Sequence, residues 1–244
     1  MRIAILADIH GNFDALLAIA RFLEDVDAVY VLGDVIGYGP QPAECLNWLV
    51  ERKAKILMGN HEAACTGVLS LEWFNPVAYE ALLWTKKVLP TKALELIQSF
   101  PLCEVLTEAI LGVHGTLSDP LEEYLTDYRQ ALRDFKRFSF KVCFFAHTHV
   151  AEGYIWSGEQ GVVRKFSMKE GGVIALEKDK RYFVNCGSVG QPRDGDPRAC
   201  FAVLDTQEGK IYVRRVDYPV EETASKILEA GLPAVLAMRL FQGR

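Results

Sequence analysis

The stretch IAILADIHGN, residues 3–12, is a short apolar run that ends in an Asp-x-His motif. An apolar run of this length, bounded by Gly and Asn, predicts a buried strand of the kind found in sheets covered on both faces. The ends of such strands are where α/β proteins place their chemistry. Asp8 and His10 can together present a carboxylate oxygen and an imidazole nitrogen to one metal ion.

Further apolar runs end in the same kind of polar motif. They are VLGD at residues 31–34, ILMGNHE at 56–62, ILGVHG at 110–115 and CFFAHTH at 143–149. A single such motif also fits an Asp that caps a helix and a His in a turn. The chain has only five histidines, however, and every one follows a predicted strand. This distribution favours one shared functional site.

The composition is typical of a large α/β domain. Half of the 244 residues are hydrophobic, and the net charge is −5, without a Lys/Arg cluster that would favour a nucleic-acid partner. The six cysteines show no C-x-x-C pairing, which favours reduced thiols in a cytoplasmic protein. The first apolar run is too short for a signal peptide, and no stretch approaches a membrane span. We therefore expect no membrane partner, and a homo-oligomer remains open.

The first third of the chain alternates between strands and helices. We expect strands at 3–7, 28–32 and 55–58, and helices at about 13–24 and 42–52, the first capped by Asn12. This order implies a largely parallel sheet with the loop ends of all three strands at one edge. Five polar side chains should converge there: Asp8, His10, Asp34, Asn60 and His61.

The rest of the chain predicts a helical segment followed mainly by strands. Residues 63 to about 100 carry an aromatic stripe at helical spacing, which indicates helix core, although part of the segment could cover the site. Strands are expected at 103–106, 109–113, 141–145, 153–156, 162–167, 173–177, 182–185, 200–204 and 210–216, and helices near 126–136, 219–230 and 234–241. These short strands suggest a second sheet. The polar, Gly-rich loop 185–196 is of a kind that often carries function.

The side chains at the strand ends form a set of metal donors. The set contains four imidazoles, two carboxylates and one amide: Asp8, His10, Asp34, Asn60, His114, His147 and His149. It contains no thiolate, which argues against a structural zinc site. Seven ligands exceed one tetrahedral site but suit two ions that share a carboxylate. Two ions about 3.5–4 Å apart can hold the attacking and leaving oxygens of a phosphoryl displacement.

These motifs, in this order, resemble the full motif set of the calcineurin-like metallophosphoesterases. The loop NCGSVGQPR at 185–193 resembles an extra loop of the small bacterial and archaeal phosphodiesterase branch. The resemblance spans about residues 1–217. It implies an α/β fold: a four-layer α/β/β/α sandwich of two mixed sheets flanked by helices, with a binuclear metal site at the strand ends. Residues 1–244 would form a single domain of this kind.

The resemblance also implies a role for each residue of the site. One metal would be held by Asp8, His10 and His149, the other by Asn60, His114 and His147, and Asp34 would bridge both. A metal-bridging hydroxide would attack phosphorus. His61 would stabilise the transition state or protonate the leaving oxygen, with Glu62 as its partner. From the residues alone, His61 is only a histidine next to a predicted ligand, and its imidazole titrates near the working pH.

The chain departs from the family pattern at three places. Ala146 replaces a usual Gly, for which we expect modest strain. Cys186 replaces a common Pro and could loosen its loop or offer a thiol to the site. No Asp-Arg-Gly follows Gly33-Asp34, which argues against a protein Ser/Thr phosphatase because a phosphate-clamping Arg is missing there.

Two further residues are candidates for substrate binding. Arg193 could replace the missing clamp, or it could pair with Asp194 or Asp196 in a solvated loop. Tyr38 could stack on a base, or it could pack on its own helix. Both pairs of alternatives stay open at the level of sequence.

The favoured function is a cytoplasmic phosphodiesterase that acts on a small nucleotide-like phosphoester with two divalent metal ions. Manganese is the first choice, and iron, nickel, cobalt and zinc also suit imidazole and carboxylate ligands. The alternatives are a non-catalytic scaffold with the same fold, a phosphomonoesterase, a protein phosphatase and a nuclease. The nuclease lacks the basic groove that its substrate would require.

Overall fold

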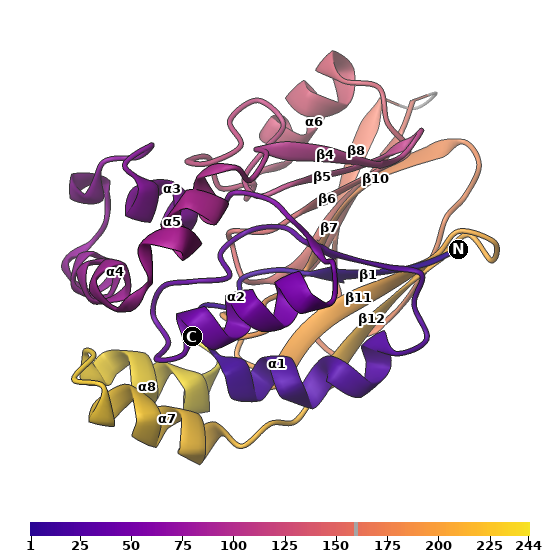
Figure 1. Ribbon diagram of the computed structural model, residues 1–244. Helices are drawn as coiled ribbons and strands as arrows, with labels where there is room; N and C mark the ends of the chain where they lie inside the picture. The colour runs from indigo at the N-terminus through magenta and orange to yellow at the C-terminus, as the bar shows by residue number, and fades with distance from the viewer. Residues whose placement is uncertain (159–160) are drawn as a thin grey trace.

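The computed structural model describes residues 1–158 and 161–244, which form two six-stranded mixed sheets (Figure 1). The first sheet has the order β3-β2-β1-β11-β12-β9. Its strands are β1 (Arg2–Leu6), β2 (Ala28–Val31), β3 (Lys55–Ile56), β9 (Gly172–Ala175), β11 (Ala199–Asp205) and β12 (Lys210–Val216). β1, β2 and β3 are parallel, as their strand–helix alternation predicts, and β11 runs antiparallel to β1. The loops after β1, β2 and β3 therefore leave the sheet at one edge.

The second sheet has the order β4-β5-β6-β10-β7-β8. Its strands are β4 (Cys103–Thr107), β5 (Ile110–Val113), β6 (Val142–Phe145), β7 (Ala151–Ser157), β8 (Val162–Ser167) and β10 (Lys180–Cys186). β5, β6 and β10 are parallel, and β4, β7 and β8 pair antiparallel with their neighbours. The loops that follow β5 and β6 consequently share an edge as well.

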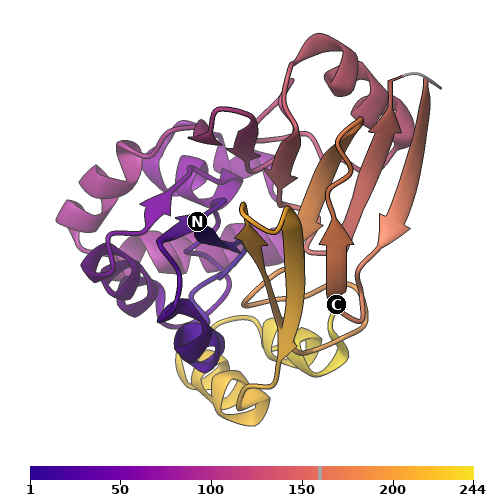
Figure 2. The same ribbon diagram turned by 90° about the vertical axis from the view of Figure 1, so that its right-hand side faces the viewer.

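The two sheets pack face to face between layers of helices. Along β1, Ile3 and Ile5 join the core between the sheets, whereas Ala4 and Leu6 pack toward α1 (Phe13–Ala20) and α2 (Pro42–Glu51). Along β6, alternate side chains face the same inter-sheet core and α6 (Tyr128–Arg137). Figure 2 shows α6 and the second sheet on the side away from α1. Burial on both faces explains the apolar runs, and the predicted four-layer sandwich is confirmed.

The helical segment contains α3 (Asn60–Thr66), a 3₁₀ turn at Leu71–Trp73, α4 (Pro76–Val88) and α5 (Thr91–Gln98). The chain closes with α7 (Val220–Glu229) and α8 (Ala234–Gln242). A cluster of small and aliphatic side chains joins α4, α7 and α8 to Tyr38. The C-terminal helices thus lie beside a loop of the site. Among the described residues, no helix combines the length and the apolar character needed to cross a bilayer.

Several predicted boundaries differ from those in the structure, among them the ends of the first helix and of the third strand. The first helix ends at Ala20 and continues as a 3₁₀ turn, Arg21–Leu23. The strand expected at 55–58 is only Lys55–Ile56. The amide of Leu57 still donates to the carbonyl of Val31 in β2, and that of Met58 donates to the carbonyl of Pro101, both at 2.9 Å. The chain has therefore left the sheet two residues before Asn60.

Phe144 is fully buried in the core between the sheets. It is the second-to-last residue of β6, the strand that leads to His147 and His149. We expect Phe144→Ala to lower the free energy of unfolding by about 3–5 kcal/mol, because it leaves a cavity that the two sheets close only in part. Urea denaturation measures this loss. Val105→Ala, at a side chain that is 59% exposed, is the control. Equal effects of the two substitutions would contradict the assignment of Phe144 to the core.

Candidate metal centre

The polar side chains that follow the strands converge on one buried site. Asp8 and His10 follow β1, Asp34 follows β2 and Asn60 follows β3, all in the first sheet. His114 follows β5, and His147 and His149 follow β6, in the second sheet. The seven side chains are each at most 3% exposed. Both sheets therefore contribute donors to the same site.

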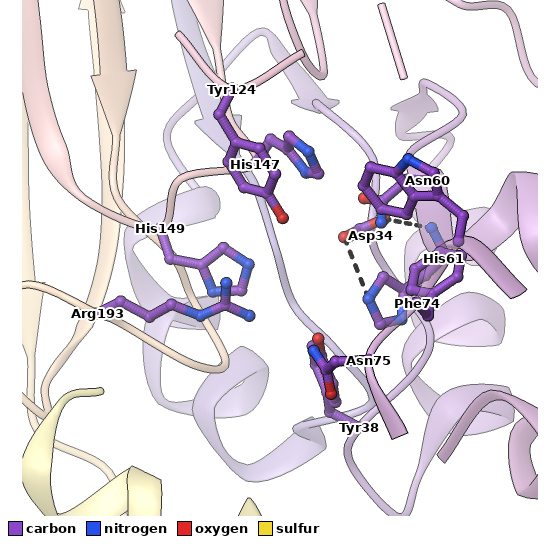
Figure 3. Close-up of a pocket in the computed structure, with 11 residues that line it drawn as sticks. Asp34, Tyr38, Asn60, His61, Phe74, Asn75, Tyr124, His147, His149 and Arg193 are labelled. Carbon is purple, nitrogen blue, oxygen red and sulfur yellow. Dashed lines mark hydrogen bonds and ion pairs between the residues drawn. The ribbon is translucent and has the colours of Figure 1, made fainter. Parts of the chain in front are cut away.

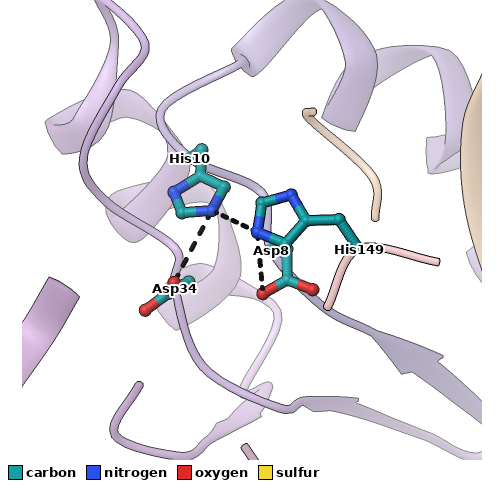
Figure 4. Close-up of side chains that lie close together, drawn as sticks. All are labelled: Asp8, His10, Asp34 and His149. Atoms are coloured by element: carbon teal, nitrogen blue, oxygen red, sulfur yellow. Dashed lines mark hydrogen bonds and ion pairs between the residues drawn. The ribbon is translucent and has the colours of Figure 1, made fainter. Parts of the chain in front are cut away.

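The donor atoms form two groups that share Asp34. The first group contains Asp8, His10, Asp34 and His149 (Figure 4), and the second contains Asp34, His114 and His147. Within each group the ligand atoms lie within 4.8 Å of one another. Asn60 adjoins the second group, because its Oδ1 lies 2.9 Å from His114 Nε2. The structure brings together all seven residues that the sequence selected, although their roles as ligands stay predictions.

Backbone carbonyls fix the protonation of the rings in the first group. His10 Nδ1 lies 3.1 Å from the carbonyl of Ile36, and His149 Nδ1 lies 2.6 Å from that of Gln191. A carbonyl only accepts, so each Nδ1 carries the proton and each Nε2 of the neutral ring carries a lone pair. These two Nε2 atoms face each other at 3.1 Å. Two lone pairs repel at this distance, whereas a cation between them would bind both.

The second group follows the same logic. His114 Nδ1 donates to the carbonyl of Leu32 at 2.8 Å, which leaves a lone pair on Nε2. This Nε2 faces Asn60 Oδ1 and, at 3.1 Å, His147 Nδ1. It also lies 3.5 Å from Asp34 Oδ2. A ring that donates one N–H to a carbonyl and aims its other nitrogen at further donors has the usual arrangement of a metal-binding histidine.

Burial sets the charge state of the site. It is the main cause that lowers the pKa of His10, His147 and His149 well below the usual value, and that of His114 to about 4. Burial also raises the pKa of Asp34 to about 7, and burial together with Asp34 raises that of Asp8. Among the described residues, neither carboxylate oxygen of Asp8 has a hydrogen-bond partner. Neutral imidazoles and poorly solvated carboxylates are a donor set that fits two divalent cations.

The backbone of the site is held in a sparsely populated conformation. Asp8, His10, Asp34, His147 and His149 have φ between 50° and 68°, in the left-handed region. Such a residue costs about 1–3 kcal/mol and persists only where its surroundings hold it. The backbone hydrogen bond from His10 to Asp34 (2.9 Å) and that from Arg193 to His149 (3.0 Å) do so. Apolar periodicity gives no indication of this strain, which is concentrated at the predicted ligands.

Glu62 differs from its predicted role. Its buried carboxylate accepts from the amides of Asp34 (2.7 Å), Val35 (2.8 Å), Ile36 (3.2 Å) and Gly59 (3.0 Å). Within the described parts of the chain it makes no hydrogen bond to the ring of His61, because α3 directs the carboxylate to the loop after β2. Burial and the charge of Asp34 raise the pKa of Glu62 to about 7. Glu62 therefore fixes the loop that carries Asp34.

A pocket of about 250 Å³ opens onto the donor groups (Figure 3). Arg193 extends into it from the loop after β10, and its Nη2 donates to Gln191 Oε1 at 3.0 Å. The alternative pairing of Arg193 with its acidic neighbours is not observed. Asp194 pairs with Arg215, and Asp196 pairs with Arg198 at 2.6 Å. This geometry leaves the guanidinium available to an anion in the pocket.

Tyr38 packs against two site histidines, and the guanidinium of Arg193 lies over its ring, with Cζ 5.8 Å from the ring centroid. Its ring centroid is 4.6 Å from that of His10 and 4.5 Å from that of His61, and the residue is 7% exposed. It packs with α4, α7 and α8, not with its own helix. Tyr38 lines the pocket with little exposed surface, and the stacking of a base on its ring stays a prediction.

Part of the pocket wall comes from the segment 63–100, which the sequence left open as a possible cover of the site. Trp73, Phe74 and Asn75 of that segment line the pocket, whereas helix core was the favoured interpretation of its aromatic stripe. The sequence interpretation did not single out Asn75 or Tyr124. Phe74 packs edge-on against His61, with ring centroids 5.3 Å apart. Tyr124 stacks on His147 at 3.7 Å. The loop of Tyr124 is held by Glu123, which Arg133 binds at 2.6 Å. Nothing in the local sequence pattern distinguishes these side chains from ordinary loop residues.

The two other departures from the family pattern are structural. Ala146 is buried, and its backbone is not among those with positive φ, so a Cβ is tolerated there. Cys186 lies in the core between the sheets, where burial raises the pKa of its thiol. Its thiol is therefore a core group and does not line the pocket.

Comparisons with known proteins find a matching family model and several similar proteins. The family model for calcineurin-like phosphoesterases matches residues 1–175. An uncharacterised protein of Methanocaldococcus jannaschii is 33% identical over 247 residues, 99% of this chain and 98% of that protein. A metallophosphoesterase structure from Sphaerobacter thermophilus is similar over the full length of both chains, with 36% identity and a TM-score of 0.87. A symmetrical bis(5'-nucleosyl)-tetraphosphatase of Psychromonas ingrahamii is 40% identical over 63 residues, 24% of this chain and 23% of that protein.

Asp34→Asn tests whether the two groups share a ligand. We expect the wild-type protein to retain two Mn²⁺ ions per chain after dialysis and the variant to retain at most one, because one carboxylate serves both groups. At free metal about 100-fold above Kd, each ion should stabilise the wild-type fold by about 2.7 kcal/mol. Elemental analysis and thermal unfolding measure these effects. The exposed Asp179→Asn is the control, and two tightly held ions in Asp34→Asn would refute the shared ligand.

Glu62→Gln tests the support of the Asp34 loop. A glutamine has one acceptor oxygen, so its NH₂ group would face backbone N–H donors that the carboxylate now satisfies. We expect the free energy of unfolding to fall by about 2–4 kcal/mol, since each unsatisfied buried donor costs about 1–3 kcal/mol. Guanidinium denaturation of the metal-stripped protein measures the loss. Glu44→Gln, at an exposed position of α2, serves for comparison; a loss below about 0.5 kcal/mol for Glu62→Gln would rule out this role.

Proposed function

The chain belongs to the calcineurin-like phosphoesterase family, and we propose from this premise that it is a metal-dependent phosphodiesterase acting on a small nucleotide-like phosphoester. The observation that supports the proposal best is the pair of donor groups joined by Asp34 at the base of a small pocket. His61 and Arg193 line the same pocket. A phosphate group in it would meet metal donors, an imidazole and a guanidinium together.

Two divalent ions fit the residues. One would be held by Asp8, His10 and His149, the other by Asn60, His114 and His147, with Asp34 between them. The two carboxylates carry a charge of −2 when ionised, so two divalent ions leave the site positive and attractive to a phosphate anion. When bound, the ions supply the Lewis acidity that makes water a stronger nucleophile and neutralises charge on phosphate oxygens.

The protein itself positions the ester. Arg193 offers guanidinium N–H groups to phosphate oxygens, in the role of the clamp that the loop after Asp34 lacks. The ring of His61 is held between Tyr38 and Phe74, and its Nε2 lies 3.9 Å from Asp34 Oδ2. Its Nδ1 has no hydrogen-bond partner among the described residues. Because Nδ1 is buried against Gly37, Nε2 is the nitrogen that would contact a phosphoryl oxygen or the oxygen that leaves.

The shape of the pocket favours a small ester over a protein substrate. A volume of about 250 Å³ accommodates a phosphate and part of one organic group. The rings of Trp73, Phe74 and Tyr124 provide an aromatic wall for that group. The short similarity to a bis(5'-nucleosyl)-tetraphosphatase supports a nucleotide-like substrate. No specific observation favours the scaffold alternative.

The test compares bis(p-nitrophenyl) phosphate with p-nitrophenyl phosphate, using metal-stripped protein supplemented with Mn²⁺, Ni²⁺, Zn²⁺ or Mg²⁺. We expect metal-dependent hydrolysis that is faster for the diester. His61→Ala should lower kcat by about 10²–10⁴-fold, the usual contribution of a residue that acts on the reacting proton or charge. Retention of two ions by the variant shows that its metal site is intact.

Each other outcome contradicts part of the proposal. Faster hydrolysis of the monoester would indicate a phosphomonoesterase. Undiminished turnover by His61→Ala would remove His61 from the reaction. No turnover of either ester or of a nucleotide panel, with two ions bound per chain, would favour the scaffold.

A further inference from the structure

A second hollow adjoins the metal pocket, and we call it the arginine hollow. It has a volume of about 430 Å³. Four of its lining residues also line the metal pocket: Tyr38, Asn75, Tyr124 and Arg193. The others, Val235, Arg239, Gln242 and Arg244, come from α8 and the residues after it. The two spaces therefore adjoin, and a ligand longer than the metal pocket would reach from one into the other.

The arginine hollow is strongly positive in a chain of net charge −5. Three arginines are among its lining residues, and no Asp or Glu is. Other arginines of the fold are neutralised, such as Arg133 by Glu123, Arg198 by Asp196 and Arg215 by Asp194. In contrast, Arg193, Arg239 and Arg244 take part in no ion pair within residues 1–158 and 161–244. Three guanidinium groups around one space repel one another, and an anion between them would remove that repulsion.

Tertiary contacts fix the two segments that carry these arginines against each other. The amide of Gly195, in the Arg193 loop, donates to the carbonyl of Gly243 at 2.9 Å. Gly243 has φ of 60°, and a Cβ there would lie 2.6 Å from the backbone of Asp196. Leu236 and Leu240 of α8 are buried with Tyr38. The close approach at Gly243 thus places Arg239 and Arg244 beside the opening of the metal pocket.

We propose, on the basis of the phosphodiesterase function above, that the arginine hollow binds a second phosphate group of the substrate. The scissile phosphate would lie at the metal donors, and Arg193 would contact both it and the next phosphate. The preferred substrate is then a phosphoanhydride of a nucleotide. An ester with a single phosphate fills only the inner space.

The reaction on such a substrate balances as a hydrolysis. The oxygen of one water forms a bond to the scissile phosphorus, and the bond from that phosphorus to the bridging oxygen breaks. The bridging oxygen leaves with the electron pair as part of the second phosphate. This leaving group is an anion that the arginines stabilise, and the protons of the water pass to solvent and to the products.

The first measurement is the ratio of kcat/KM for diadenosine tetraphosphate to that for bis(p-nitrophenyl) phosphate. We expect the double variant Arg239→Gln/Arg244→Gln to lower this ratio at least tenfold, mainly through KM for the tetraphosphate. Each single variant should give a smaller loss in the same direction. Arg52→Gln, at the exposed C-cap of α2, removes one positive charge at a residue that lines neither the metal pocket nor the arginine hollow and should leave the ratio unchanged.

The second measurement does not depend on turnover. Calorimetry of metal-stripped protein with inorganic tripolyphosphate should show binding that weakens at least tenfold in the double variant and falls with added salt. If the wild type hydrolyses neither substrate, the proposed function fails, and this titration alone decides the inference. An unchanged affinity for tripolyphosphate in the double variant overturns the inference. A lower affinity with an unchanged kcat/KM ratio in an active enzyme overturns it too, because the arginines would then bind anions outside the reaction.

Discussion

Mutual repulsion between buried electron-pair donors is the constraint on which the site depends. His10 and His149 aim Nε2 atoms at each other across 3.1 Å, and His114 aims its Nε2 at Asn60 Oδ1 across 2.9 Å. A flexible chain would relax such contacts. Here the carbonyls of Ile36, Gln191 and Leu32 each hold one ring by its other nitrogen. The rings therefore cannot rotate away without losing a buried hydrogen bond.

The packing of the two sheets sets the distance between the donors. Each donor group draws residues from both sheets: His149 joins the Asp8 side of the site, and Asp34 joins the His114 side. The inter-sheet core, with Ile5 of β1 and Phe144 of β6, lies directly behind these strand ends. A close-packed core transmits displacements because it has few voids to absorb them. The geometry of the site is thus a property of the sandwich and not of any one loop.

The sequence predicts the parts of this arrangement that depend on local pattern. Apolar runs locate the strands, and their ends locate Asp8, Asp34 and His147, because burial on both faces leaves a continuous apolar signal. The function of Glu62, the aromatic wall with Tyr124 and the position of Arg239 depend on contacts between segments distant in sequence. Tyr124 meets His147 only because Arg133 and Glu123 fold its loop back. The periodicity of apolar residues carries no information about such contacts. It also gives no sign of the positive φ angles at the predicted ligands.

The distribution of charge links the two spaces. The donor groups are rich in electron pairs and, with their carboxylates ionised, need positive charge from ions. The adjoining hollow holds arginines that form no ion pair with any described residue. Arg193 lines both spaces, and its positive charge acts on Asp8 and Asp34, lowering their pKa against the effect of burial. A chain of net charge −5 repels phosphate anions at long range, but screening confines that effect to about 8 Å at physiological salt. Recognition of a multiply charged ester would therefore depend on these local arginines, whose position is set by the contact between Gly195 and Gly243.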